Sequence, residues 1–151
     1  MNIQLVLMNH TQRAVLEPQL TDHFAEDLMR FLAIPRQEAQ AIAVSKLEEI
    51  WNEESGLYFA IIKPDNDQLC GALIAGAYES QDQITLYELF IVDDCRNQGI
   101  GRKALGLFEA LSKEKGFSQI ALSVMAGNEN ALKLYRSGGF DTISYLMTKN
   151  L

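Results

Sequence analysis

The chain has few cysteines, no long apolar run and a shortage of positive charge. Only two cysteines occur among 151 residues, and they show neither zinc-site spacing nor enough partners for a disulfide framework. No segment approaches the ~20 apolar residues that a membrane-spanning helix requires. The first residues carry no basic region and no cleavage site, so we expect no secretory signal and a cytoplasmic location.

The charge balance is acidic, with 13 Lys and Arg against 20 Asp and Glu, which gives a net charge of −7. Nonspecific nucleic-acid binding depends on clustered basic residues, so this composition argues against a nucleic-acid partner. It is compatible with a cationic substrate such as an amine. The length is that of a single domain, 1–151, which can bury about two thirds of its unfolded surface.

The spacing of apolar residues predicts an α/β fold in which strands and helices form layers. The predicted strands are 3–8, 57–62, 69–77, 84–92, 118–124 and 140–148. The predicted helices run from about Leu20 to Leu32, from Ala39 to Trp51, over 99–115 and over 128–137. The order is therefore β-α-α-β-β-β-α-β-α-β, and we expect a mixed sheet with helices on both faces.

The most informative segment lies between the strand 84–92 and the helix 99–115. It reads Arg96-Asn97-Gln98-Gly99-Ile100-Gly101-Arg102. Glycines at a helix start let a ligand approach the backbone, because no Cβ stands in the way. The first helical N–H groups have no partner within the helix and lie at the positive end of its dipole. Such a helix start binds phosphate, and we expect Arg96 and Arg102 to add mobile positive charge at its rim.

A second motif follows one helix and one strand later. It reads Asn128-Glu129-Asn130-Ala131-Leu132-Lys133-Leu134-Tyr135-Arg136-Ser137-Gly138-Gly139-Phe140. The two motifs, Arg-x-x-Gly-x-Gly and then Asn-x-x-Ala-x-x-x-Tyr with Gly-Phe, together resemble the GNAT superfamily of N-acetyltransferases. The resemblance covers about residues 84–145, whereas the N-terminal half matches only in its order of elements. It implies a metal-independent transferase that moves an acetyl group from acetyl-coenzyme A to a primary amine by direct attack in a ternary complex.

The resemblance also implies how the donor is held. The loop 96–102 binds the pyrophosphate, and Asn128 contacts the pantetheine arm besides capping its own helix. The strand before the loop parts from its parallel neighbour near a β-bulge, which leaves N–H groups around Leu89 and Phe90 for the thioester oxygen. The end of that strand pairs with pantetheine like an added strand. The predicted cofactor-binding residues are Phe90, Ile91, Val92, Arg96, Asn97, Gln98, Gly99, Ile100, Gly101, Arg102 and Asn128.

Two residues are candidate catalytic groups. Tyr135 stands at the helical position where the family's tyrosine protonates the departing thiolate. Glu88 lies on the strand that leads to the carbonyl site, so we expect it to take the proton of the amine. Strict alternation places Tyr87 and Glu88 on opposite faces, unless a bulge changes it. The weaker candidates for the base are ordered water, Glu79, Asp93 and Asp94.

The chain departs from the family pattern at its C-terminal end. Only a dozen residues follow Gly139, whereas the family often closes with a two-stranded hairpin. One strand fits there, at 140–148. The acceptor pocket then lacks one wall, which the second subunit of a homodimer could supply.

The other reactive side chains have simple interpretations. His10 and His23 show no carboxylate or cysteine partner at a readable spacing, so we interpret both as surface or packing residues. Cys95, next to Arg96, is interpreted as a free thiol in a loop. Trp51 is expected in the core.

Two other functions remain open. The pattern Gly99-x-Gly101-x-x-Ala104 also satisfies the dinucleotide fingerprint, but six residues separate it from the strand and position 119 holds Gln where an acid is expected. An acyl-coenzyme A sensor or partner-binding domain would use the same loop without turnover, although Tyr135 favours catalysis. The acceptor amine, the acyl chain length, the base and the oligomeric state cannot be read from the sequence.

Overall fold

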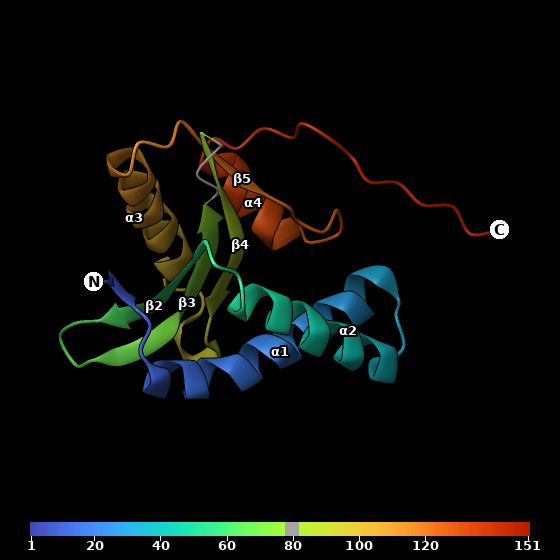
Figure 1. Cartoon of the computed structure of the whole chain (residues 1–151), viewed down its shortest axis with the longest axis horizontal. Coiled ribbons are helices and arrows are strands. Elements are labelled where there is room, and N and C mark those ends of the chain that lie inside the picture. Colours follow the sequence, from blue (N-terminus) through green and yellow to red (C-terminus); the bar gives the residue numbers. More distant parts are fainter. Residues whose placement is uncertain (78–81) are drawn as a thin grey trace.

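The computed structural model describes residues 1–77 and 82–151, which form one five-stranded sheet flanked by α-helices. The elements are β1 (Gln4–Leu7), α1 (His10–Leu32), α2 (Arg36–Trp51), β2 (Gly56–Lys63), β3 (Gln68–Ala77), β4 (Gln83–Ile91), the short 3-10 helix η1 (Asp93–Cys95), α3 (Ile100–Glu114), β5 (Gln119–Leu122) and α4 (Glu129–Ser137). In Figure 1, α1 and α2 lie side by side, and α3 covers a different side of the sheet. The predicted order is confirmed as far as α4.

The strands follow one another across the sheet in sequence order, and only β4 and β5 are parallel neighbours. This parallel pairing is short, since it joins Gln83–Leu86 to Gln119–Leu122. Beyond Leu86, β4 continues to Ile91 with β3 beside it, and no described strand lies on its other side. The parting of the two strands that the resemblance implied is therefore confirmed.

A β-bulge at Tyr87 interrupts the pairing of β3 with β4. Ile74 pairs with Glu88 and Ala75 pairs with Leu86, so Tyr87 is an extra residue on β4. An extra residue shifts the alternation of the side chains. Leu86 packs toward α3, whereas Tyr87 packs toward α1 and α2. The bulge implied by the resemblance is confirmed at this position.

An apolar cluster on each face of the sheet packs the helices against it. Successive residues of β3 point to opposite faces, so β3 contributes to both clusters. On the face of α1 and α2, the buried residues are Leu16, Leu20, Leu47, Ile50, Trp51, Ala72, Ile74 and Phe90. On the face of α3, they are Phe59, Leu73, Ala75, Ile84, Leu86, Leu105 and Phe108. Trp51 is thus in the core, as predicted.

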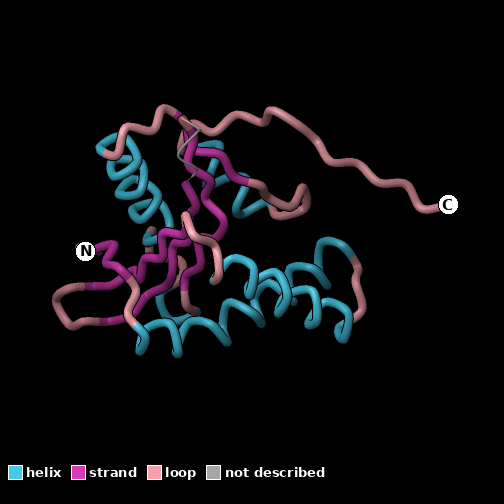
Figure 2. Tube along the Cα trace, in the orientation of Figure 1, coloured by secondary structure: helices cyan, strands magenta, loops and turns pink. Residues whose placement is uncertain are grey.

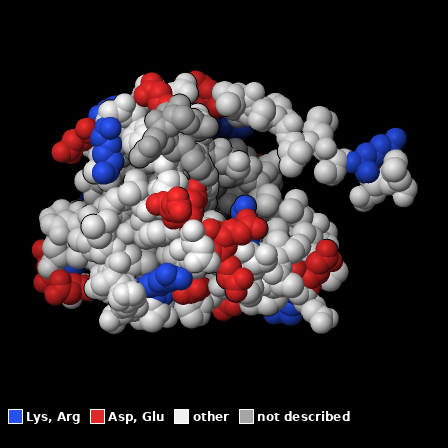
Figure 3. All heavy atoms as spheres, in the orientation of Figure 1, with Lys and Arg blue, Asp and Glu red and all other residues white. Residues whose placement is uncertain are grey.

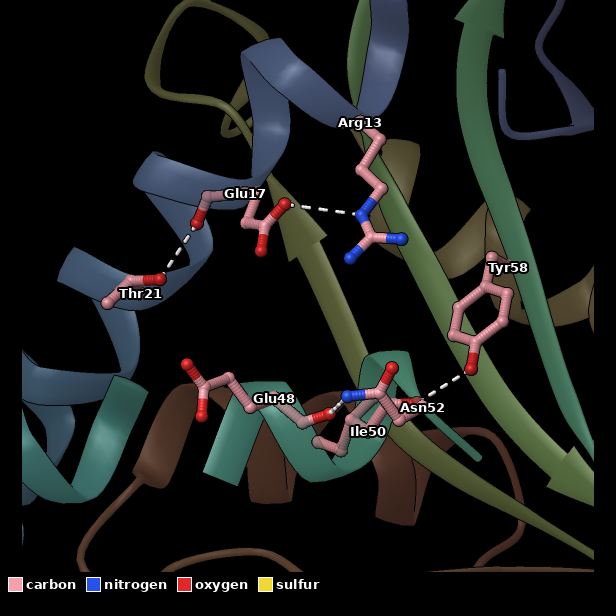
Figure 4. Close-up of polar contacts among 7 residues, drawn as sticks. All are labelled: Arg13, Glu17, Thr21, Glu48, Ile50, Asn52 and Tyr58. Atoms are coloured by element: carbon pink, nitrogen blue, oxygen red, sulfur yellow. Dashed lines mark hydrogen bonds and ion pairs between the residues drawn. The ribbon is translucent and has the colours of Figure 1, made fainter. Parts of the chain in front are cut away.

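Polar contacts fix the ends of the first two helices. Figure 4 shows Tyr58 of β2 donating its hydroxyl hydrogen bond to the carbonyl of Ile50 at 2.6 Å, which ties the sheet to the end of α2. α1 begins at His10, about ten residues earlier than predicted, because Asn9 and Gln12 form a capping box there. It is 23 residues long and contains Pro18.

No helix in the described part of the chain is long and apolar enough to cross a membrane.

The predicted last strand at 140–148 is wrong. No regular structure follows Ser137, and residues 140–151, called here the C-terminal arm, run away from the sheet (Figure 2). Ile143 is 90% exposed and Leu146 is 98% exposed. The arm has the composition of a strand, but a strand forms only where a neighbour supplies hydrogen-bond partners.

Candidate active site

The start of α3 presents backbone N–H groups in a turn built by two residues with positive φ. Asn97 has a φ of 58° and Gly99 a φ of 74°, in the left-handed region that Gly and Asn tolerate best. Gly99 is the N-cap of α3, and no side chain caps the helix. The first N–H groups of α3 can therefore bind an anion such as the pyrophosphate of coenzyme A.

Gly101 leaves space at this helix start that internal packing does not require. A Cβ at position 101 would lie 3.7 Å from Cδ2 of Leu134 and 4.0 Å from Cγ1 of Ile91, which is ordinary contact. Crowding by the protein therefore does not require a glycine at this position, whereas a ligand that approaches the backbone would require one.

Arg96 is held against β4, so the expectation of a mobile charge is wrong for this residue. Its Nε donates a hydrogen bond to the carbonyl of Ile91 at 2.9 Å, and its Nη1 lies 2.9 Å from Oδ1 of Asp93. Its guanidinium lies 5.8 Å from the centre of the Phe90 ring. Asp93, a weaker candidate for the base, thus serves as the partner of Arg96.

Lys63 adds a positive charge to the loop that sequence reasoning missed. Its Nζ donates to Oε1 of Gln98 at 2.9 Å, and Nε2 of Gln98 donates to the carbonyl of Asp94 at 3.0 Å. Arg102 is exposed next to this loop. Lys63 lies 35 residues before Gln98, so no local pattern could have identified it.

Backbone alternation decides which groups of β4 face the opening between β4 and β5. Val92 donates its N–H to the carbonyl of Cys70 at 2.9 Å, so this N–H is not available to pantetheine. Because paired and unpaired positions alternate in an antiparallel ladder, the N–H groups of Leu89 and Ile91 point away from β3. Leu89 is therefore better placed than Phe90 for binding the thioester oxygen.

Glu88, Asp27 and Tyr135 come from β4, α1 and α4; Asp27 affects the pKa of Glu88, and Glu88 affects the pKa of Tyr135. Burial, and then the negative charge of Asp27, raise the pKa of Glu88 to about 7. Burial, and then the charge of Glu88, raise the pKa of Tyr135 to about 12. Burial also raises the pKa of Asp27, against the opposing charge of His23. The structure thus brings the two predicted catalytic residues into electrostatic contact, together with Asp27.

The interpretation of His23 as a residue without a carboxylate partner is wrong. Its Nε2 lies 3.5 Å from Oδ2 of Asp27, and its ring lies 5.2 Å from that of Phe90. Residues four apart on a helix share a face, so this spacing in the sequence could have identified the pair. Asp27, like Lys63, is a residue of the site that sequence reasoning missed.

α4 positions the remaining predicted residues. Oδ1 of Asn128 accepts a hydrogen bond from the N–H of Ala131 at 3.2 Å, which confirms Asn128 as the cap of α4. The ring of Tyr135 lies 5.7 Å from that of Phe140 in an edge-to-face arrangement. Glu79 lies outside the described residues. The contact of Asn128 with pantetheine remains a prediction.

Cys95 is free but is not the loop thiol that was expected. Cys95 and Cys70 are both fully buried, and their Sγ atoms lie 2.9 Å apart. Burial, and then the hydrogen bond with Cys95, raise the pKa of Cys70 to about 11, so this thiol stays protonated at neutral pH. Both cysteines pack with Ile100 and Ala104 in the core behind the loop.

Two further features of the described residues bear on ligand binding. They contain no group of three His, Cys, Asp or Glu side chains that could hold a metal ion. A shallow hollow of about 790 Å³ lies along α2, and none of the predicted site residues contributes to it. Its lining residues are Arg36, Gln37, Gln40, Ala41, Val44, Ser45 and Glu48.

Comparisons with known proteins give a family match and related sequences. Residues 20–140 match the family described as Acetyltransferase (GNAT) family. The uncharacterised N-acetyltransferase YycN of Bacillus subtilis is 28% identical over 71 residues, which are 47% of this chain and 46% of YycN. The uncharacterised N-acetyltransferase YdgE of Bacillus subtilis is 29% identical over 101 residues, which are 66% of this chain and 64% of YdgE. The sequence matches thus span about half to two thirds of these relatives.

Solved structures share the fold over nearly the whole chain. The crystal structure of YycN superimposes with a TM-score of 0.86 at 22% identity, covering 99% of both chains. An aminoglycoside acetyltransferase from a soil metagenomic sample, in complex with sisomicin, superimposes with a TM-score of 0.65 at 18% identity. It covers 99% of this chain and 95% of that one.

Replacing Gly101 by Ala tests the start of α3 as a donor site. The new methyl group meets no protein atom closer than 3.7 Å, and Ala is the better helix former, so we expect unchanged or higher stability. We also expect acetyl-coenzyme A to bind about tenfold or more weakly, because the methyl group stands where the pyrophosphate approaches. Calorimetric titration and thermal unfolding measure the two effects.

Gly106→Ala is the matched control, since Gly106 lies on the same helix and a Cβ there would meet nothing within 4 Å. It should change stability in the same direction and leave donor affinity unaltered. Equal donor affinity in both variants would place the pyrophosphate elsewhere.

Proposed function

Because the chain belongs to the GNAT acetyltransferase family, we propose that it moves an acetyl group from acetyl-coenzyme A to a primary amine within a ternary complex. Its membership makes it an acyltransferase, and the family generally uses acetyl-coenzyme A and acts on amine acceptors. The observation that best supports the proposal is the opening between β4 and β5, next to the uncapped start of α3.

Two parts of this opening bind the donor: the start of α3 and the free edge of β4. The N–H groups of α3, with Lys63 and Arg96 beside them, neutralise the pyrophosphate. The N–H of Ile91 pairs with the pantetheine arm, and the N–H of Leu89 donates to the thioester oxygen. Acetyl-coenzyme A supplies the thioester carbonyl that the amine attacks. Leu89 stabilises the negative charge that develops on this oxygen.

The amine must lose its proton to react. An alkylammonium group with a pKa of ~10.4 is mostly protonated at pH 7, and deprotonating it costs about 4–5 kcal/mol. Bulk water takes this first proton before the amine attacks. Glu88, with a pKa of about 7, then accepts the second proton of the nitrogen, directly or through water, as the C–N bond forms. The bulge at Tyr87 makes this geometry possible, because it puts Glu88 on the same face as Tyr87, toward α1, and no longer on the face of Leu86.

Tyr135 protonates the thiolate that leaves as the C–S bond breaks. With its pKa at about 12, its proton is in place throughout the physiological range. Complete transfer of the Tyr135 proton to a thiolate of pKa ~8.5 costs about 5 kcal/mol while Glu88 is charged. This cost falls when Glu88 takes the amine proton, because the charge that raises the pKa of Tyr135 is then neutralised. Proton transfer from Glu88 to Tyr135 finally restores both groups.

The charge of the site favours a cationic acceptor. Asp27 of α1 lies close enough to Glu88 of β4 for its charge to raise the pKa of Glu88, and acidic side chains gather near α2 on the face drawn in Figure 3. Negative potential raises the local concentration of ammonium compounds. The related acetyltransferase solved with sisomicin, an aminoglycoside, is consistent with a polyamine-like acceptor.

An assay of coenzyme A thiol release across a panel of amines tests the proposal. We expect release that depends on the amine, with multiply charged amines preferred over peptides that carry one amino group. Donor binding without amine-dependent release would instead favour the second candidate, an acyl-coenzyme A sensor that uses the same loop.

Tyr135→Phe should slow turnover by about 10- to 1000-fold and leave donor affinity within about twofold, because only the proton donor is removed. Stopped-flow measurement of thiol release gives the rate. Tyr145→Phe is the control, since Tyr145 is 79% exposed on the C-terminal arm. Wild-type turnover in Tyr135→Phe would remove this residue from the mechanism.

The pH profile reports on Glu88. Its raised pKa means that the carboxylate form is lost as the pH falls through about 7. Below pH 7 we therefore expect log kcat/KM of the wild type to fall more steeply with pH, by one additional unit of slope, because Glu88 is protonated. Glu88→Gln should lack this additional unit. Identical profiles would assign the base to ordered water.

A further inference from the structure

Tyr87, the extra residue of the β4 bulge, donates a hydrogen bond to the side chain of Glu53, which follows α2. Its Oη lies 2.7 Å from Oε1 of Glu53. The hydroxyl of Ser55 donates to the same oxygen at 3.1 Å. Tyr87 and Glu53 are 34 residues apart, so their hydrogen bond ties the middle of β4 to the segment between α2 and β2.

The sheet has room for this contact because a glycine, Gly76 of β3, lies beneath it. A Cβ on Gly76 would lie 2.5 Å from Cε2 of Tyr87, 2.7 Å from its Oη and 3.0 Å from Oε1 of Glu53. Gly56 of β2 lies opposite Gly76, and a Cβ there would overlap the hydroxyl of Tyr58. A side chain at position 76 would therefore displace both partners of the hydrogen bond.

The bulge decides which face of the sheet carries Glu88. Ala75 pairs with Leu86 on one side of the bulge. Ile74 pairs with Glu88 on the other side. If the first register continued without a bulge, Glu88 would lie opposite Leu73, whose side chain packs on the face of α3. A slip by one residue moves a side chain to the other face of a sheet, so the bulge is what keeps Glu88 toward α1.

We propose that Tyr87 and Glu53 are positioning residues, which hold the bulge in β4 and thereby keep Glu88 on the face of α1. The proposal rests on the function proposed for Glu88, since it explains how this carboxylate is held in the site. A bulged residue makes no pair in the ladder, so its side chain is the group that can fix it. Tyr87 is partly buried against the apolar cluster of this face, where its hydroxyl needs the acceptor that Glu53 supplies.

The ionisation of Glu88 reports on its position. Burial, and then the negative charge of Asp27 on α1, raise the pKa of Glu88 to about 7. The charge of Glu88 in turn raises the pKa of Tyr135 on α4. Both causes of the raised pKa depend on where the carboxylate lies. A carboxylate that leaves this place for solvent returns to an ordinary pKa.

Tyr87→Phe tests the hydrogen bond, because it removes the hydroxyl and keeps the ring in the apolar cluster. An NMR titration of isotope-labelled glutamate carboxyl groups, with the signal assigned through Glu88→Gln, gives the pKa of Glu88 without any substrate. We expect this pKa to fall from about 7 towards the ~4.3 of an exposed glutamate. We also expect kcat to fall by about 10- to 100-fold, because the base is misplaced, and the Kd of acetyl-coenzyme A to change by less than about threefold.

Glu53→Gln and Glu53→Ala repeat the test at the other end of the hydrogen bond and separate it from the charge. Gln keeps an oxygen that accepts from both Tyr87 and Ser55, so Glu53→Gln should retain the wild-type pKa of Glu88 and the wild-type kcat. Glu53→Ala should match Tyr87→Phe, and the double variant should lose no more than either single variant, because the same contact is removed. Gly76→Ala should give the same loss, since its methyl group displaces Tyr87.

Tyr58→Phe is the matched control. It removes a tyrosine hydroxyl that packs against the same cluster but donates to the carbonyl of Ile50, so the Tm should fall while the pKa of Glu88 stays at about 7. An unchanged pKa of Glu88 in Tyr87→Phe overturns the proposal. A lowered pKa of Glu88 in Glu53→Gln overturns it too, since charge and not the hydrogen bond would then be responsible.

Failure of the positioning role is distinct from failure of the proposed function. If the wild type shows no amine-dependent thiol release but Tyr87→Phe lowers the pKa of Glu88, the hold on the bulge is supported and the proposed function is wrong. If the wild type releases thiol and Tyr87→Phe changes neither kcat nor the pKa of Glu88, the positioning role is wrong and the proposed function stands.

Discussion

The parting of β4 from β5 is the constraint on which the candidate site depends. A strand in the middle of a sheet normally has both of its edges paired, and unpaired backbone groups are costly when they are buried. Here β3 holds one edge of β4 over its full length, while the bulge at Tyr87 bends the strand where β5 ends. The opening that results exposes the N–H groups of Leu89 and Ile91 beside the start of α3, so that a ligand can complete the sheet.

The same bulge sets the electrostatics of the site. It places Glu88 toward α1, where burial, and then the negative charge of Asp27, raise its pKa to about 7. Keeping an acid there lowers stability when it is ionised, a cost that is typical of functional sites and has no use in packing. Basic groups lie at the other end of the opening, where Arg96 is fixed by Asp93 and Lys63 by Gln98. The proposed site thus has a cationic end beside the start of α3 and an anionic end beside α1.

Much of this arrangement is local in the sequence and could be predicted from it. The uncapped start of α3 follows from glycines at fixed spacing after a strand, and the cap at Asn128 follows from its place before a helical pattern. The family resemblance implied the bulge, the parting of the strands and the position of Tyr135. The pair of His23 and Asp27 was equally local, since residues four apart share a helix face, but it was overlooked.

The sequence by itself therefore determined the order of the elements as far as α4 and the glycine-rich start of α3, because each depends on neighbours within a few residues. The choice of Tyr135 as the candidate acid came from the family resemblance. Only the tertiary structure decided that Glu88 faces Asp27, that Lys63 reaches the loop, and that Cys70 and Cys95 meet in the core. These contacts join distant segments, for which no spacing rule exists. The segment 140–148 shows the same limit, because a strand pattern gives a strand only where the segment pairs with another strand.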